Sequence, residues 1–242
     1  MVKIGVIGTG YWGRNLVRNF NALGALAGIC DTNSAALDAI AKDYPEIPRF
    51  GSVEDLLAQS EIGAVAISTP AITHGQIACD ALAANKHVFV EKPLCLDLAQ
   101  AGDLELQADK AGRVLMVGHL MLYHPAFRAL RAAVLDGNIG TLRYIYSTRL
   151  SLGKIRREES ALWSFAPHDI SMILALANRI PRQVLTNGGA YLSAGVADTT
   201  LSHFTFSDNL QAHIFVSWLH PFKDHRLVVV GSDGMIVFDD VR

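Results

Sequence analysis

One stretch near the start of the chain constrains the fold more than any other. An apolar run over residues 2–7 reaches a G-x-G-x-x-G pattern at Gly8, Gly10 and Gly13, and apolar residues at helical spacing follow it. In a strand–turn–helix of this kind the first glycine permits a tight turn and the second lets the backbone approach a pyrophosphate. The third glycine lets the helix and the strand pack closely. The pattern therefore predicts a βαβ unit whose turn binds a dinucleotide.

A carboxylate follows at the distance that this interpretation requires. A second apolar run, residues 25–30, ends on Asp31, and an acid about 20 residues beyond the glycine turn is the expected ligand of the adenosine ribose. No arginine stands in the two positions after Asp31. A carboxylate there repels a 2′-phosphate, so we expect NAD and not NADP. The side chains and backbone assigned to the cofactor in this region are Gly8, Thr9, Gly10, Tyr11, Trp12, Gly13 and Asp31.

Composition excludes several classes of partner. The chain has 242 residues, half of them hydrophobic, which suits one large domain or two small ones. A net charge of −2 gives no basic field for nucleic acid, and no apolar run approaches the roughly 20 residues that cross a bilayer. The cysteines are odd in number and lack C-x-x-C spacing, which indicates reduced thiols in a cytoplasmic protein and neither a disulfide nor a zinc framework. They are Cys30, Cys79 and Cys95.

Apolar strands alternate with amphipathic helices through residue 118, which predicts a doubly wound parallel sheet. After the first two strands, further strands are expected at residues 64–67, 87–90 and 114–118. Helices are expected at residues 35–41, 53–57, 73–84 and 97–111. Two of these strands end in polar motifs, and the carboxyl ends of parallel strands are where such sheets bind ligands. We assign the following residues at these ends to the cofactor: Ser68, Thr69, Pro70, His74, Glu91 and Lys92.

From His119 the pattern changes to that of an α+β domain. A helix is expected at residues 125–136, and a second one is expected to begin near His168 and to end near residue 178. Strand-like runs lie at residues 141–150, 182–191, 198–206, 210–218, 226–230 and 235–238, and residues 207–209 are typical of a hairpin turn. We therefore predict two domains, residues 1–118 with the parallel sheet and residues 119–242 with a largely antiparallel open sheet.

The strand-end motifs resemble those of a known family. T-P at residues 69–70, His74 and E-K-P at residues 91–93, behind the glycine turn, resemble the Gfo/Idh/MocA oxidoreductases over essentially the whole chain. That resemblance implies an N-terminal Rossmann domain and a C-terminal domain whose open sheet makes a homo-oligomer, a dimer or a tetramer. It also implies that Lys92 is catalytic at the nicotinamide and that His168, in the second domain, is catalytic too.

A finer resemblance points to substrates. The string W-S-F-A-P-H-D-I at residues 163–170 is similar to members that oxidise the 3-hydroxyl of a nucleotide sugar of the UDP-N-acetylglucosamine type. Many members carry an aspartate where this chain has Ser164, so the resemblance does not extend to the aspartate of a three-residue Lys–Asp–His relay. The family also tends to run longer by several tens of residues. The chain is therefore either a short member or lacks a C-terminal part.

The chemistry assigns roles to the two candidate catalytic residues. Oxidation of a secondary alcohol needs a hydride acceptor, a group that takes the hydroxyl proton, and stabilisation of the oxygen. A lysine held neutral at pH 7 costs about 4–5 kcal/mol, whereas a histidine with a pKa near 6.5 needs almost no adjustment. We assign His168 as the general base and Lys92 as the cation that orients the hydroxyl. The reverse assignment stays open, because burial can lower a lysine pKa by several units. We expect the two side chains to meet over the nicotinamide.

Further residues are candidates for substrate contact. They are His119, Tyr123, Trp163, Ser164 and His168. For His119 and Tyr123, as for His124, packing is an equal alternative. The basic run Lys154, Arg156 and Arg157 could clamp a pyrophosphate, although such a run is more often solvated surface.

Two other functions remain to be separated from a nucleotide-sugar dehydrogenase. One is a non-catalytic protein that senses dinucleotides, and the other is a dehydrogenase of a free polyol such as inositol. No Y-x-x-x-K is present, which argues against the short-chain dehydrogenases. No cysteine–histidine set has the spacing of a catalytic zinc site, so we expect no metal.

Overall fold

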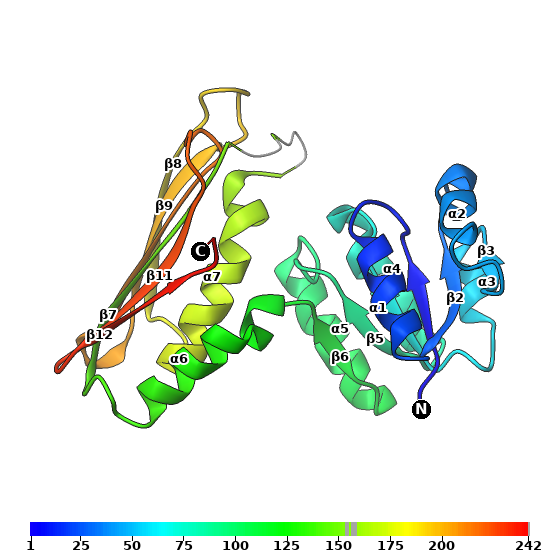
Figure 1. The fold of residues 1–242 in the computed structure, drawn as a ribbon, viewed down its shortest axis with the longest axis horizontal. Coiled ribbons are helices and arrows are strands. Elements are labelled where there is room, and N and C mark those ends of the chain that lie inside the picture. Colours follow the sequence, from blue (N-terminus) through cyan, green and yellow to red (C-terminus); the bar gives the residue numbers. More distant parts are fainter. Residues whose placement is uncertain (153–154, 156–158, 242) are drawn as a thin grey trace. The chain divides into compact units, whose positions relative to one another are not determined.

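The structure is a computed structural model that describes residues 1–152, 155 and 159–241. The chain folds into two compact units, Met1–Gly118 and His119–Arg242 (Figure 1). Within the described residues, each unit is built on one six-stranded sheet. The two units are described in turn.

The first unit contains the predicted doubly wound sheet. Its strands are all parallel and run in the order β3-β2-β1-β4-β5-β6. They are β1 (Ile4–Ile7), β2 (Leu26–Cys30), β3 (Arg49–Phe50), β4 (Ala64–Ile67), β5 (His87–Val90) and β6 (Leu115–Val117). The central strands are apolar on both faces, as parallel strands covered by helices must be. Val65, Ala66 and Ile67, for example, are completely buried.

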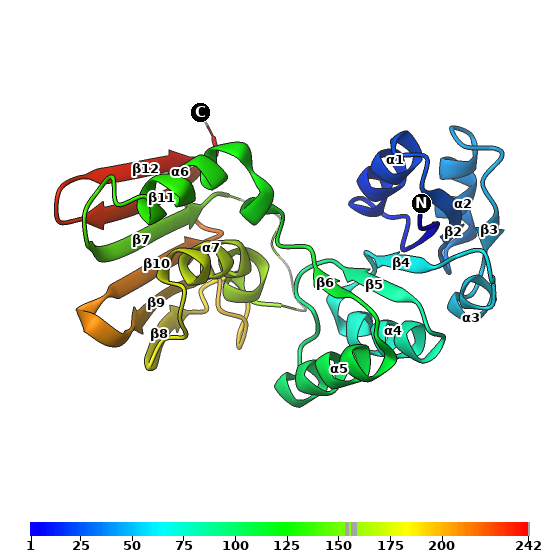
Figure 2. The same cartoon turned by 90° about the horizontal axis from the view of Figure 1, so that it is seen from below.

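Helices cover both faces of this sheet. α1 (Gly13–Ala22) and α2 (Ser34–Ala41) pack on one face, with Val17 and Leu37 in the core. α3 (Val53–Leu57), α4 (Ala71–Ala83) and α5 (Leu98–Ala111) pack on the other face. Figure 2 shows α1 and α2 on one side of the strands and α4 and α5 on the other. This arrangement places the carboxyl ends of β1, β4 and β5 along one edge.

The second unit contains the predicted α+β architecture. Its sheet has the order β12-β11-β7-β10-β9-β8, and every neighbouring pair is antiparallel except β10 with β7. The strands are β7 (Leu142–Leu150), β8 (Gln183–Gly189), β9 (Thr199–Thr205), β10 (Gln211–Ser217), β11 (Asp224–Gly231) and β12 (Met235–Asp239). The 3-10 turn η2 (Ser207–Asn209) joins β9 to β10, as the hairpin prediction required.

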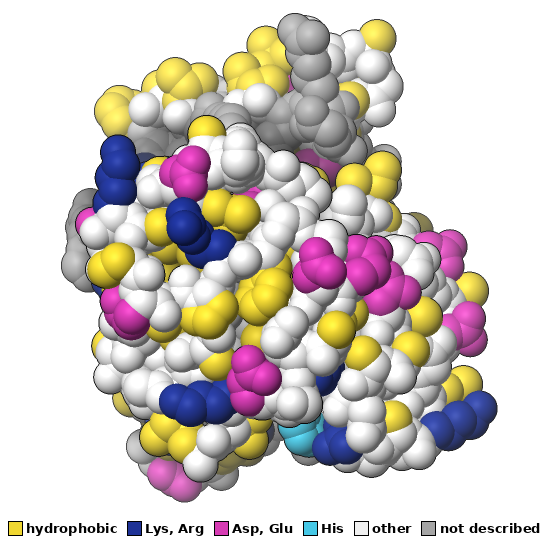
Figure 3. Space-filling view, turned by 90° about the vertical axis from the view of Figure 1, so that its right-hand side faces the viewer, with side chains coloured by type: hydrophobic (Ala, Val, Ile, Leu, Met, Phe, Trp, Pro, Cys, Tyr) yellow, Lys and Arg dark blue, Asp and Glu magenta, His cyan; other side chains and the backbone are white. Residues whose placement is uncertain are grey.

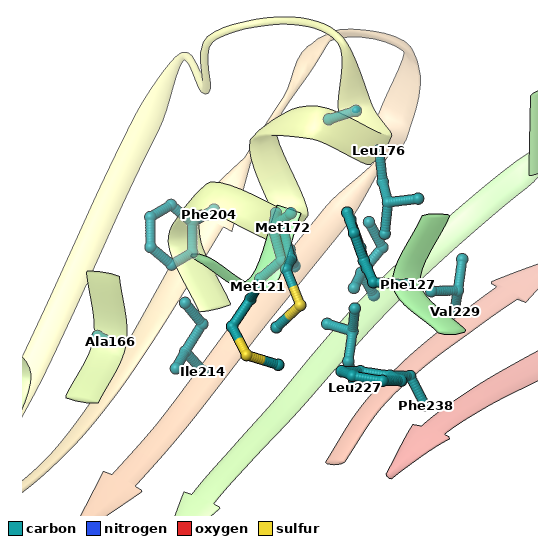
Figure 4. Close-up of a cluster of buried hydrophobic side chains, with 14 of the residues drawn as sticks. Met121, Phe127, Ala166, Met172, Leu176, Phe204, Ile214, Leu227, Val229 and Phe238 are labelled. Atoms are coloured by element: carbon teal, nitrogen blue, oxygen red, sulfur yellow. The ribbon is translucent and has the colours of Figure 1, made fainter. Parts of the chain in front are cut away.

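Two helices, α6 (Pro125–Leu135) and α7 (Ala161–Ala177), lie on one face of the second sheet, and the short 3-10 helix η1 (Leu120–Tyr123) precedes them (Figure 1). The core of the unit fills the space between these helices and the sheet. Figure 4 shows Met172 of α7 and Phe127 of α6 close to Ile214 and Leu227 of the strands. Alternation along the strands then directs every second side chain to the opposite face.

The start of α7 differs from the prediction. The sequence pattern predicts a helix beginning near His168. The helix begins instead at Ala161, and Pro167 lies inside it. Ala161, Ser164 and Ala166 are buried against the unit, so packing supports the first turns in spite of the proline. The prediction that His168 opens a helix was therefore wrong, because His168 lies near the middle of one.

The surface gives two further findings. Among the residues that the structure describes, no helix is long and apolar enough to cross a membrane, and no group of three His, Cys, Asp or Glu side chains is placed to hold a metal ion. On the face shown in Figure 3, acidic and basic side chains are interspersed among apolar ones.

Candidate functional site

The glycine turn lies at the point where the strand order of the first sheet reverses, between β1 and β4. Gly8 has a φ of +90°, and a Cβ there would lie 2.8 Å from the backbone of Ser68, at the end of β4. A Cβ on Gly13 would lie 1.9 Å from the Gly8 carbonyl oxygen, whereas Gly10 has nothing within 4 Å. The turn is therefore closed where it packs and open at Gly10, as a backbone that receives a pyrophosphate must be.

Asp31 lies beside this turn. Its Oδ2 accepts hydrogen bonds from the backbone N–H of Thr9 at 2.7 Å and from the Thr9 hydroxyl at 3.0 Å. Its Oδ1 accepts from the backbone N–H of Asn33 at 2.9 Å, while Asn33 itself caps α2. These donors hold the carboxylate at the carboxyl end of β2, adjacent to the turn. Each carboxylate oxygen has further acceptor capacity for ribose hydroxyls.

The end of β4 is tied to the turn. The Ser68 hydroxyl donates to the Gly8 carbonyl oxygen at 2.8 Å. One residue on, the Thr69 hydroxyl accepts a hydrogen bond of 2.8 Å from Thr73, in the first turn of α4. The exposed Pro70 then precedes the helix. The segment of residues 68–70 is thus held against the glycine turn, as the strand-end interpretation expects.

His74 connects two strand ends. Its ring is buried, with Nδ1 2.7 Å from the Pro93 carbonyl oxygen and Nε2 2.8 Å from the Thr69 carbonyl oxygen. Both partners are backbone carbonyl oxygens, one after β5 and one after β4. His74 therefore connects the segment after β4 to the segment after β5. It does not offer its ring on the surface.

Glu91 and Lys92 follow β5, and a cis peptide bond joins Lys92 to Pro93. The Trp12 indole N–H, from the glycine turn, donates to the Glu91 carboxylate at 2.6 Å. Burial raises the pKa of Glu91 against the opposing effect of this hydrogen bond. Trp12 is partly exposed, and its neighbour Tyr11 is 94% exposed. The structure thus brings the E-K-P motif and the glycine turn into direct contact.

The candidate residues of the second unit lie on η1 and α7. Tyr123, on η1, is 60% exposed, and Trp163, on α7, is 43% exposed. Ser164 is buried, while His119 and His168 are partly buried. His124 caps α6, since its Nδ1 accepts from the backbone N–H of Ala126 at 3.3 Å. The basic candidates Lys154, Arg156 and Arg157 lie outside the described residues.

Sequence reasoning missed a buried ionic group directly after His168. Asp169 on α7 accepts from Arg149 Nε on β7 at 2.6 Å, and the Arg149 terminal nitrogen donates to Asp240 at 3.0 Å. The available signal was the alternation of residues 141–150. It places Arg149 on the same face as the fully buried Ile145. A charge on that face requires a buried partner.

Two family models match the chain. Residues 2–119 match the oxidoreductase family with an NAD-binding Rossmann fold, and residues 127–237 match the GFO/IDH/MocA C-terminal domain. The chain belongs to the Gfo/Idh/MocA family. It is therefore an oxidoreductase, and its cofactor is NAD. The open glycine turn at Gly10 and the carboxylate of Asp31 fit that cofactor.

Individual members of the Gfo/Idh/MocA family are similar to almost all of the chain. UDP-N-acetylglucosamine 3-dehydrogenase of Acidithiobacillus ferrooxidans is 32% identical over 96% of this chain and 72% of its own length. A solved structure of that enzyme has a TM-score of 0.89 at 30% identity and covers 98% of this chain and 74% of the other. Myo-inositol 2-dehydrogenase of Thermotoga maritima is 26% identical over 100% of this chain and 76% of its own length.

Proposed function

We propose that this oxidoreductase oxidises a ring hydroxyl of a nucleotide-linked sugar, at C3 of the hexose. The observation that carries the proposal is the position of Lys92. It follows β5 at the carboxyl edge of the sheet, next to a glutamate that is hydrogen bonded to the glycine turn. A cation at that edge lies where nicotinamide enzymes of this topology carry out their chemistry. The likeness to UDP-N-acetylglucosamine 3-dehydrogenase supports the choice of substrate.

In this proposal the first unit holds the cofactor. The backbone of the glycine turn and the N-terminus of α1 bind the pyrophosphate, and Asp31 binds the adenosine ribose. The segment of residues 68–70 and the Glu91 carboxylate border the other half of the cofactor. When bound, NAD supplies the acceptor for the substrate hydride. His74 acts indirectly, by holding the segments after β4 and β5 together.

Lys92 and His168 divide the remaining chemistry. His168 takes the hydroxyl proton as the general base, because an imidazole is largely neutral at pH 7. Lys92 donates a hydrogen bond to the same oxygen and stabilises the negative charge that develops on it. The exposed Trp163 and Tyr123 offer flat surfaces for a sugar or a base, with His119 and Ser164 as further candidate contacts.

The outward face of the second sheet is proposed to bind a second copy of the chain, giving a dimer or a tetramer. Leu185, Leu201 and Phe215 point away from α6 and α7 and are 56%, 49% and 37% exposed. Adjacent apolar side chains on one sheet face are typical of a surface that is covered in an assembly. Phe215→Asp, compared with wild type by light scattering, is expected to lower the molar mass. An unchanged mass would contradict this interface.

The function is tested by following nicotinamide reduction with a panel of nucleotide sugars and free polyols. Lys92→Ala and His168→Ala are each expected to lower kcat by about 100-fold or more, the usual size of a lost acid–base group. Arg179→Met, which alters an ion pair at the far end of α7, serves as the control. Full turnover in both alanine variants would overturn the site assignment.

A free polyol is the second candidate substrate, because the chain is also similar to myo-inositol 2-dehydrogenase. Turnover of inositol without turnover of any nucleotide sugar would favour it. A protein that only senses dinucleotides would turn over neither class, yet NAD would still raise its unfolding temperature by mass action.

A further inference from the structure

Arg149 is a buried cation in the second unit that the proposed chemistry does not use. Its side chain is 6% exposed, and its guanidinium donates to two carboxylates, Asp169 and Asp240. The Nε–Oδ2 distance to Asp169 is 2.6 Å, and a second guanidinium nitrogen lies 3.4 Å from the other oxygen. A buried arginine is costly unless its partners are in place. The guanidinium also lies 3.2 Å from Nδ1 of His225. The position of Arg149 therefore depends on four separate segments.

These segments are β7, β11, α7 and the residues after β12. Asp169 belongs to α7 and is 1% exposed. The Ser147 hydroxyl, two residues before Arg149 on the same strand, donates to Oδ1 of Asp169. One carboxylate on the helix is thus held by two donors on one strand. Such a contact limits the rotation of the helix about its own axis, because both donors and acceptor have fixed directions.

The turn of α7 that carries His168 has a weakened backbone. Pro167 has no N–H, so the helical hydrogen bond to the Trp163 carbonyl is missing from this turn. The Ser171 hydroxyl donates to the His168 carbonyl at 2.7 Å on the other side. The helix thus lacks one backbone hydrogen bond in this turn, and side-chain hydrogen bonds involving Asp169 and Ser171 hold the residues that follow it.

We propose that Arg149 and Asp169 are positioning residues for His168. Their buried ion pair sets the rotation of α7 at the weakened turn, and this keeps the His168 ring in the orientation from which it takes the substrate proton. The inference rests on the proposed role of His168. Both residues are buried, so they act through the helix and not by contact with substrate.

The first arm of the test is kinetic and uses the full chain with NAD and the nucleotide sugar that supports turnover. Asp169→Asn keeps the shape of the side chain and removes the charge. It is expected to lower kcat by about 10- to 100-fold, the cost of misplacing a reacting group by about 1 Å, with KM for NAD unchanged. Arg149→Lys keeps the charge but not the planar guanidinium with its several donors. It is expected to recover part of the kcat that Arg149→Met loses.

A milder variant and a control accompany these. Ser147→Ala removes one of the donors to Asp169 and carries the test if the charge variants do not fold. It is expected to lower kcat by several-fold with unchanged circular dichroism. Arg179→Met removes the exposed pair with Asp208 at the far end of α7 and is expected to leave kcat unchanged.

The second arm does not need turnover. The His168 ring signal in the NMR spectrum is expected to shift in Asp169→Asn and to stay in place in Arg179→Met. An unmoved signal with wild-type kcat in Asp169→Asn would overturn the inference, as would an equal loss of kcat in Arg179→Met. If His168→Ala keeps full turnover, the proposed role of His168 as the general base fails instead, and the NMR arm still reports whether the pair orients the ring.

Discussion

The segment that carries Lys92 and the helix that carries His168 are held by different kinds of bond. After β5, the Pro93 carbonyl is held by the His74 ring, which also binds the Thr69 carbonyl. On α7, the residue after His168 is held by the charge of Arg149. The first arrangement uses backbone acceptors that any sequence provides. The second depends on matching charges on two elements, so a single substitution leaves a buried charge without its partner.

The largest expected effect tests the charged arrangement. Arg149→Met leaves the buried Asp169 carboxylate without its cation and removes one partner of the half-buried Asp240, which keeps His225, and is expected to lower the free energy of unfolding by about 3–5 kcal/mol. Arg179→Met removes an arginine from an exposed pair and is expected to cost under about 1 kcal/mol. Urea denaturation of both variants measures the difference. Equal losses of unfolding free energy in the two variants would show that the buried Arg149 pair contributes no more to stability than the exposed Arg179 pair.

The next effect belongs to the glycine turn. A Cβ at position 13 would lie 1.9 Å from the Gly8 carbonyl oxygen, and backbone cannot move aside as a side chain can. Gly13→Ala is therefore expected to lower the free energy of unfolding by about 2–3 kcal/mol or more. Gly10→Ala meets nothing within 4 Å, so it is expected to leave stability unchanged and to weaken NAD binding. Calorimetry with and without NAD separates the two effects. Loss of stability in Gly10→Ala would contradict this reading of the turn.

His74→Leu tests the backbone-based arrangement after β5. The substitution leaves two carbonyl oxygens, those of Thr69 and Pro93, without their donor, and this is expected to cost about 2 kcal/mol. We also expect weaker NAD binding, since both segments border the proposed cofactor site. Urea denaturation and titration with NAD measure the two quantities. If His74→Leu has the NAD affinity and the stability of wild type, His74 has no role in holding the proposed cofactor site.

The smallest effect is a pH dependence in the second unit. Burial opposes ionisation of Asp240, but the hydrogen bond from His225 and the charge of Arg149 outweigh it and lower its pKa to about 2, from 3.8. A lowered pKa stabilises the fold at pH values above the unfolded pKa, and this stability is lost as the pH falls from about 4 to about 2. Asp240→Asn is expected to reduce the loss of unfolding free energy between these pH values, by less than about 2 kcal/mol. The free energy of unfolding is measured by urea denaturation between about pH 4 and about pH 2, and the same pH dependence in Asp240→Asn and wild type would contradict the prediction.

Local patterns were enough to predict much of the fold. The glycine turn and the apolar strands depend on residues a few positions apart, and the structure has the predicted parallel sheet and the mixed, mostly antiparallel one. The predicted start of α7 near His168 was wrong because the helix continues through Pro167, a residue that ordinarily begins or interrupts a helix. Packing of Ala161 and Ser164 against the second unit overrides that signal.

The sequence by itself determined the class of cofactor and reaction. The spacing of Gly8, Gly10 and Gly13 fixes the backbone geometry of the turn, and the position of Asp31 relative to that turn can be read along the chain. Tertiary structure alone decided the partners of Arg149. Asp169 lies 20 residues away from it and Asp240 lies 91 residues away, so only the folding of β7, α7 and β12 brings the three charges together. The same is true of the Trp12–Glu91 hydrogen bond, which spans 79 residues. A charged side chain is buried only where a partner of opposite charge offsets the cost of desolvation. Which residue serves as that partner is decided by the folded chain.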